Sequence, residues 1–257
     1  MTSHSQSATA APQPPQNLAR LQEMLHSSVP EELVVAAASH LLNEELALAF
    51  LNRRDLPGRA LEALAKNSSV MKQRKVIVAV VGHPRTPRHV ALPIARRLYN
   101  FELLQIALAP AIAADLKMIA EEAIISRLET ISSGERLALA RQGSTSIVAV
   151  LLNDAEERVF LAALQNPRLT EACVSKALRN ADVRTEFVRA VCRHEKWSLR
   201  RDLRLELLRN PHTPLAHAIV FASSLPTRQL REVLRDSALA DNIKAYLEGE
   251  LERRIQS

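Results

Sequence analysis

An internal sequence match constrains this chain more than any other feature. Shifted by 127 residues, the segment 29–129 lies over 156–256 without a gap, and 19 of the 101 aligned positions are identical. Repetition within a chain is typical of architectures in which each small unit packs against its neighbours. We therefore interpret the chain as a duplicated fold, with 29–129 as copy one, 130–155 as connecting helices and 156–256 as copy two.

The strongest local agreement predicts helix boundaries. His83–Pro87 reads HPRTP and lies over Asn210–Pro214, which reads NPHTP. A threonine before a proline is typical of a helix start, with the hydroxyl at the N-cap and the proline at the first helical position. The earlier proline of each motif indicates where the preceding helix stops. Both copies are thus expected to turn between two helices at this place.

The match also decides the state of an ambiguous segment. Val76–Val81 is a continuous β-branched run that reads locally as a buried strand. Its counterpart, Leu203–Leu208, is rich in strong helix formers and carries charge. Two copies of one fold share a state, so we predict that both segments are helices.

Composition favours the all-α class. The chain has 5 Gly and 8 aromatic residues (1 Trp, 2 Tyr and 5 Phe), too few for turn-rich sandwiches and barrels. The sequence contains no GxGxxG or GxxxxGK[ST] motif, which argues against dinucleotide and P-loop chemistry. Capping patterns predict helices near 31–39, 43–54, 57–66, 69–82, 87–98, 101–109, 112–129, 133–141, 145–152, 156–165, 170–179, 183–193, 197–209, 214–224, 227–236 and 239–254. We expect more than about 70% helix, arranged as an α-solenoid of short antiparallel helices.

Helices that begin after His-Pro-x-Thr-Pro or Asn-Pro-x-Thr-Pro resemble those of HEAT-like and leucine-rich-repeat-variant proteins. The resemblance implies one α-solenoid domain over 29–256. Some leucine-rich-repeat-variant proteins carry an iron–sulfur cluster, but this chain has only Cys173 and Cys192, so no cofactor is expected. The predicted helices number nine per 127 residues, whereas a two-layer solenoid repeats evenly. Either the 112–129 helix is broken near Asp115, or one short helix does not form.

The ends and the cysteines suggest a compartment. Residues 1–28 are expected to be a disordered leader, because Met1–Gln16 is polar and proline-rich and lacks the pattern of a secretory signal. No apolar run approaches the ~20 residues that span a bilayer. Two reduced thiols suit a cytoplasmic protein.

Basic charge is concentrated in one copy. The segment 53–97 holds 11 Lys and Arg against Asp55 and Glu62, a net charge of +9 within a chain of net charge +6. The candidate residues for binding a polyanion or an acidic partner are Arg59, Lys66, Lys72, Lys75, Arg85, Arg88, Arg96 and Arg97. An ordinary solvated face whose cations pair with neighbouring glutamates explains the same run. Single-stranded nucleic acids also need aromatic platforms, and the only nearby candidates, Tyr99 and Phe101, can equally belong to the core.

No residue pattern predicts catalysis or a metal site. The spacings His83/His89 and His212/His217 do not place two ligands on one helical face. Cys192 reads as a core thiol and Trp197 as a filler between helices. The sequence therefore predicts a non-catalytic protein-interaction scaffold, with a nucleic-acid or polyanion binder as the alternative. A HEAT-like nucleic-acid enzyme is a third reading, but such enzymes use a cleft lined by Trp and Asp. The oligomeric state is left open.

Overall fold

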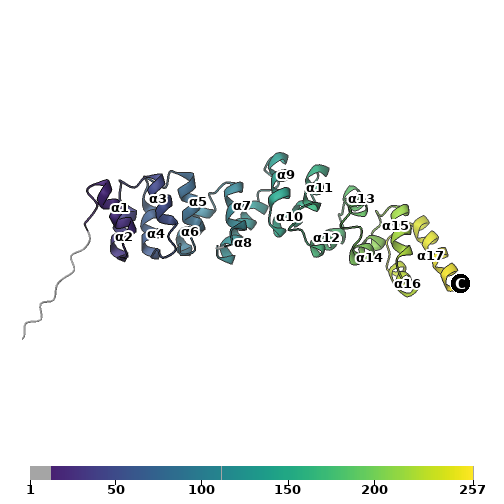
Figure 1. Ribbon diagram of the computed structural model, residues 1–257. Helices are drawn as coiled ribbons and strands as arrows, with labels where there is room; N and C mark the ends of the chain where they lie inside the picture. The colour runs from purple at the N-terminus through teal and green to yellow at the C-terminus, as the bar shows by residue number, and fades with distance from the viewer. Residues whose placement is uncertain (1–12, 111, 257) are drawn as a thin grey trace, which may run out of the picture. The chain divides into compact units, whose positions relative to one another are not determined.

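The computed structural model describes residues 13–110 and 112–256, and within these ranges the chain is 65% helical without any β-strand (Figure 1). The all-α class is confirmed. The chain divides into two compact units, unit one (Met1–Ile124) and unit two (Ile125–Ser257). The division falls close to the end of the predicted copy one.

Unit one contains helices α1 to α8. Their bounds are α1 Leu18–His26, α2 Pro30–Ala38, α3 Glu44–Leu51, α4 Gly58–Lys66, α5 Arg74–Gly82, α6 Arg88–Ala95, α7 Asn100–Leu108 and α8 Ala114–Ile125, the last reaching one residue past the division. Unit two contains α9 Ser133–Gln142, α10 Thr145–Leu151, α11 Glu157–Leu164, α12 Glu171–Leu178, α13 Thr185–Arg193, α14 Arg201–Arg209, α15 Leu215–Ser223, α16 Thr227–Arg235 and α17 Asp241–Gln256.

Helices pack mainly on those two positions away, which makes two layers within each unit. In unit one α2 packs on α4, while α3 and α7 pack on α5. In unit two α9, α11 and α13 form one such series, and α10, α12, α14 and α16 form the other. A nine-residue helix turns only two and a half times, so one apolar stripe must contact both its layer neighbour and the opposite layer. This is a repeat-like arrangement compatible with a solenoid.

Polar side chains at helix ends join successive helices of one layer. The bonds run from Asn67 Nδ2 to Ala37 O (3.0 Å), from Asn166 Nδ2 to Ala140 O (2.8 Å) and from Asn210 Nδ2 to Leu178 O (3.0 Å). Each amide oxygen accepts the N–H two residues later, as Asn210 Oδ1 does from His212 at 3.0 Å. One side chain therefore satisfies both the turn that follows its own helix and a free carbonyl of the earlier helix.

Every predicted helix exists, including the valine-rich α5, but three expectations were wrong. The helical share falls short of about 70% because turns of four to seven residues separate several of the helices. The 112–129 helix is shorter and unbroken, since α8 runs from Ala114 to Ile125. Thr86 and Thr213 do not cap the following helices. Their hydroxyls donate backwards to Val80 O and Leu207 O, each at 2.6 Å, because both side chains are buried against the preceding helix.

The leader was also drawn too long. Leu18–His26 form α1, whose N-cap residue Asn17 accepts the N–H of Arg20 at 2.8 Å. Leu21, Met24 and Leu25 are buried against the rest of unit one. The polar residues before Gln16 obscured this short apolar stripe. The part of the leader within residues 1–12 lies outside the described residues.

Helix bounds follow the 127-residue shift closely. Shifted by 127, the bounds of α3, α4, α5 and α7 coincide with those of α12, α13, α14 and α16. Shifted in the same way, the starts of α1, α2, α6 and α8 coincide with those of α10, α11, α15 and α17. Shifted back by 127, the position of α9 falls at 6–15, most of which lies outside the described residues.

Candidate binding surface

A cavity of about 360 Å³ lies between the end of α4, the start of α5 and the end of α6. We call it the α5–α6 pocket. Its lining residues are Ala65, Met71, Arg74, Ile77, Pro93, Ile94, Arg97 and Leu98. Ligand pockets span about 300–1,000 Å³, so this one suits one or two side chains better than a large cofactor.

Positive charge surrounds the α5–α6 pocket. Arg97 lines it, and Lys66 and Lys72 directly follow the lining residues Ala65 and Met71. All three are exposed, and within residues 13–110 and 112–256 their side chains make no hydrogen bond or ion pair. These three charges are therefore available to an anionic partner.

Arg74 is held on the rim by α7. Its Nε donates to Glu102 Oε1 at 2.9 Å, and a second bond joins Nη2 to Glu102 Oε2. This carboxylate raises the pKa of Arg74, and it also accepts the Tyr99 N–H at 2.7 Å. The guanidinium carbon lies 4.2 Å from the Tyr99 ring centroid. The arginine is thus fixed in place with its charge still on the surface.

Two aromatic residues beside this rim are exposed. Tyr99 is 67% and Phe101 42% exposed, so neither is the core residue that the sequence left open. Arg74 was counted among the basic residues but was not selected as a candidate. Its identity with Arg201 in the internal match was the one signal that marked it.

All eight predicted cations are exposed, but they lie at two ends of the helices of unit one. Arg59, Arg85 and Arg88 lie near the starts of α4 and α6. These two helix starts are close together, because a side chain placed at Gly58 would contact the ring of Pro87. Lys66, Lys72, Lys75, Arg96 and Arg97 lie near the ends of α4 and α6 and the start of α5, around the α5–α6 pocket. A nine-residue helix separates the two ends by about 12 Å.

The first end is more neutralised than the second. Arg85 Nη1 donates to the backbone oxygen of Asp55 at 3.1 Å, and Arg88 Nε pairs with Asp115 at 2.9 Å. Arg53 holds the pKa of Asp55 down at about 2. At the second end Lys75 pairs with Glu44 at 3.8 Å, whereas Lys66, Lys72 and Arg97 have no such partner among the described residues. Available charge therefore concentrates at the α5–α6 pocket.

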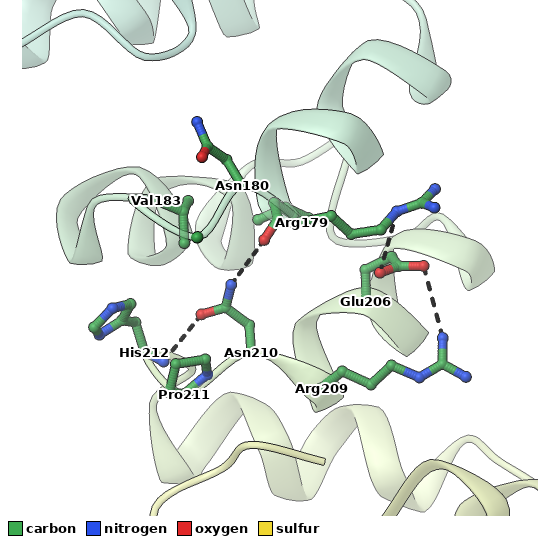
Figure 2. A pocket seen from close by; sticks show the side chains of 10 residues that line it. Arg179, Asn180, Val183, Glu206, Arg209, Asn210, Pro211 and His212 are labelled. Atoms are coloured by element: carbon green, nitrogen blue, oxygen red, sulfur yellow. Dashed lines mark hydrogen bonds and ion pairs between the residues drawn. The ribbon is translucent and has the colours of Figure 1, made fainter. Parts of the chain in front are cut away.

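A larger cavity of about 510 Å³ lies between α12 and α14 in unit two (Figure 2). Its polar groups already bind one another. Glu206 lies between Arg179 at 3.5 Å and Arg209 at 3.6 Å, while Asn210 bridges the carbonyl of Leu178 and the N–H of His212. We interpret this cavity as a by-product of the joint between two helices.

Trp197 and Cys192 have structural roles. Trp197 is 1% exposed and donates from Nε1 to Leu164 O at 2.8 Å, which confirms the filler interpretation and removes it from any cleft. Burial raises the pKa of the Cys192 thiol to about 12, so it stays protonated and unreactive near neutral pH.

The histidines likewise serve the fold or the surface. His83 lies at the end of α5, with Nε2 2.8 Å from Arg53 O and Nδ1 accepting the N–H of Arg85 at 3.2 Å. His83 therefore links the end of α5 to the turn that follows α3. Across residues 13–110 and 112–256, no three His, Cys, Asp or Glu side chains are grouped to hold a metal ion.

Comparisons with known proteins give no further guide. No protein-family model matches the chain, and no curated protein or solved structure matches it significantly. Within the described part of the chain, no helix combines the length and apolar character needed to cross a bilayer.

Proposed function

We propose that this chain is a helical-repeat scaffold of the HEAT-like or leucine-rich-repeat-variant kind that binds a protein partner without catalysing a reaction. The proposal includes a duplication of the repeat, supported by the matching helix bounds and by hydrogen bonds that recur after 127 residues. Such stacked helices present long surfaces for recognition.

The observation that carries this proposal is the use of buried polar groups. The buried polar side chains of the described residues are Ser39, His83, Thr86, Ser144, Asn166, Ser175, Asn210 and Thr213. All but Ser144 hydrogen-bond to the fold, chiefly at helix ends. Polar groups that join helices support a framework for binding, because a catalytic site would direct them towards a substrate.

Affinity purification of the full chain, run in parallel with and without nuclease treatment, tests the proposal. We expect one protein partner at a fixed ratio, and isothermal titration of the two purified proteins should reproduce the complex. Failure of that reconstitution, or recovery of nucleic acid alone, would contradict a protein scaffold.

The two free cysteines and the burial of Cys192 support a reducing, cytoplasmic setting.

Binding of nucleic acid or another polyanion is the second candidate. It is favoured by the exposed cations around the α5–α6 pocket and by the exposed rings of Tyr99 and Phe101. Stacking on aromatic rings and charge neutralisation are the two elements of single-strand recognition. Such binding is recognised by an affinity that falls steeply with salt. For single strands, the logarithm of the binding constant falls against the logarithm of the salt concentration with a slope of about −0.7 per phosphate contacted.

A further inference from the structure

We propose that the α5–α6 pocket binds an acidic peptide segment of a partner protein, with one apolar side chain in the cavity and carboxylates on the surrounding cations. This proposal rests on the scaffold function and names the chemistry of the partner. It combines two features of one place, an apolar hollow and unneutralised positive charge.

The hollow accounts for the apolar anchor. Met71, Ile77 and Ile94 line the α5–α6 pocket, and each is only partly buried. An apolar side chain that enters the cavity removes both its own surface and theirs from water. A sugar–phosphate backbone has no group that gains from such a cavity.

The charges account for the acidic flanks. Lys66, Lys72 and Arg97 are exposed without partners among the described residues, and Arg74 is held in place by Glu102. Carboxylates on both sides of an apolar anchor would reach these cations, and exposed charges of this kind steer association and select partners. The exposed Tyr99 beside Arg74 adds the type of side chain that anchors protein interfaces.

Unit two shows how the equivalent place is closed. The counterpart of Ile77 is Arg204, whose Nε donates to Ser198 O at 2.7 Å and whose Nη1 donates to Ser224 Oγ at 3.2 Å. Its guanidinium carbon lies 5.5 Å from the Phe221 ring centroid. Ser224 is also the counterpart of Arg97, and Leu199 is the counterpart of Lys72. A cation of the chain itself therefore occupies the site here, and two of the rim charges are absent.

The test uses fluorescence anisotropy of the full chain with a short labelled peptide that carries one leucine between glutamate pairs. We expect saturable binding that weakens about tenfold or more when the leucine becomes serine or the glutamates become glutamine. Equal binding of either altered peptide, or no binding of the parent peptide, would overturn the proposal.

Two variants locate the site. The closing variant Ile77→Arg with Arg97→Ser copies unit two, so it should fold and lose peptide binding. Lys66→Gln, Lys72→Gln and Arg97→Gln together should weaken binding about tenfold. The matched control changes Arg54, which is exposed in the turn before α4, together with Arg59 and Arg88 to glutamine. It removes the same charge from the other end and should leave affinity within about threefold. Similar losses in both triple variants would overturn the site, and circular dichroism checks that each variant is folded.

Competing ligands separate the outcomes. A single-stranded polyuridine probe that binds more tightly than the peptide through the same cations would replace the peptide proposal with nucleic-acid binding. A purified protein partner that still binds the closing variant with full affinity would refute the α5–α6 pocket as its site while leaving the scaffold function intact.

Discussion

The segment from α5 to α7 and its counterpart from α14 to α16 share a framework but differ in surface chemistry. In unit one Arg74 forms an ion pair with Glu102, and in unit two Arg201 Nη2 donates to Gln229 Oε1 at 2.7 Å. Positions 102 and 229 correspond under the 127-residue shift. The bond that joins the two helices persists although the charge on one partner is lost.

Between these anchored ends the two segments diverge. Ile77 and Arg97 leave a hollow with charge at its rim, whereas Arg204 and Ser224 bond to each other. Contacts between helices tolerate few alternatives, while surface positions are free to change. The comparison teaches that the helix-end bonds define the fold and that the space between them carries what is specific to each unit.

The largest expected effect concerns Trp197, because at this place the two units make the same kind of helix-end bond with different side chains. Trp197 donates to the carbonyl of Leu164, the role that Asn67 has towards Ala37, and its own counterpart is Val70. Trp197→Ala should lower the free energy of unfolding by about 3–5 kcal/mol, against about 2 kcal/mol for Val70→Ala. Urea unfolding followed by circular dichroism measures both, and equal losses would show that the two cores are more alike than their contacts suggest.

Two buried hydroxyls test the shared framework. Thr86→Val and Thr213→Val each remove a 2.6 Å bond and leave Val80 O or Leu207 O without that donor. Each should cost about 0.5–1.5 kcal/mol, the net value of one hydrogen bond, because each carbonyl still accepts a backbone N–H, from His83 or from Asn210. Similar losses in urea titrations would show that the matched geometry has matched energy. A large loss at one site with none at the other would break the correspondence.

Sequence reasoning predicted most of the framework because its signals are local or repeated. The internal match placed the valine-rich α5 as a helix against its own β-branched composition. Capping and proline patterns placed the other predicted helices to within a few residues, although Thr86 and Thr213 do not cap α6 and α15. It missed α1, since a cap at Asn17 and three apolar residues are weak signals beside a polar leader.

The candidate site was only partly predictable. The sequence found the basic segment, but separation of its cations into two ends depends on which helix ends meet. The hollow beside Arg97 depends on side chains from three helices, and Glu44, Glu102 and Asp115, which pair with cations of that segment, lie outside it. Exposure of Tyr99 likewise follows from packing, because an aromatic residue at a helix start suits core and surface equally.

A smaller effect is expected where unit one has a charge and unit two does not. Glu102→Gln copies Gln229 and should keep one bond to Arg74 while removing the ion pair. The loss should be below about 1 kcal/mol and should shrink at high salt, because both groups lie near the surface. The reciprocal Gln229→Glu should stabilise unit two by a similar amount. Thermal unfolding at low and high salt measures both, and a salt-independent loss would point to packing as the cause.

The smallest effect is a pH dependence specific to unit two. Burial and the charge of Lys196 lower the pKa of His194 below its usual 6.5, although Glu195 opposes this. The folded chain then binds a proton at His194 more weakly than the unfolded chain. The contribution of His194 to the free energy of unfolding is fully present above about pH 6.5 and is lost as the pH falls through its lowered pKa. His194→Asn, which copies Asn67, should therefore lose less stability than the parent on acidification. The His194 ring lies 6.1 Å from the ring of Trp197, so fluorescence of this single tryptophan follows the transition in urea at about pH 7.5 and about pH 5. An unchanged difference between the two pH values in His194→Asn would assign the acid sensitivity to other groups.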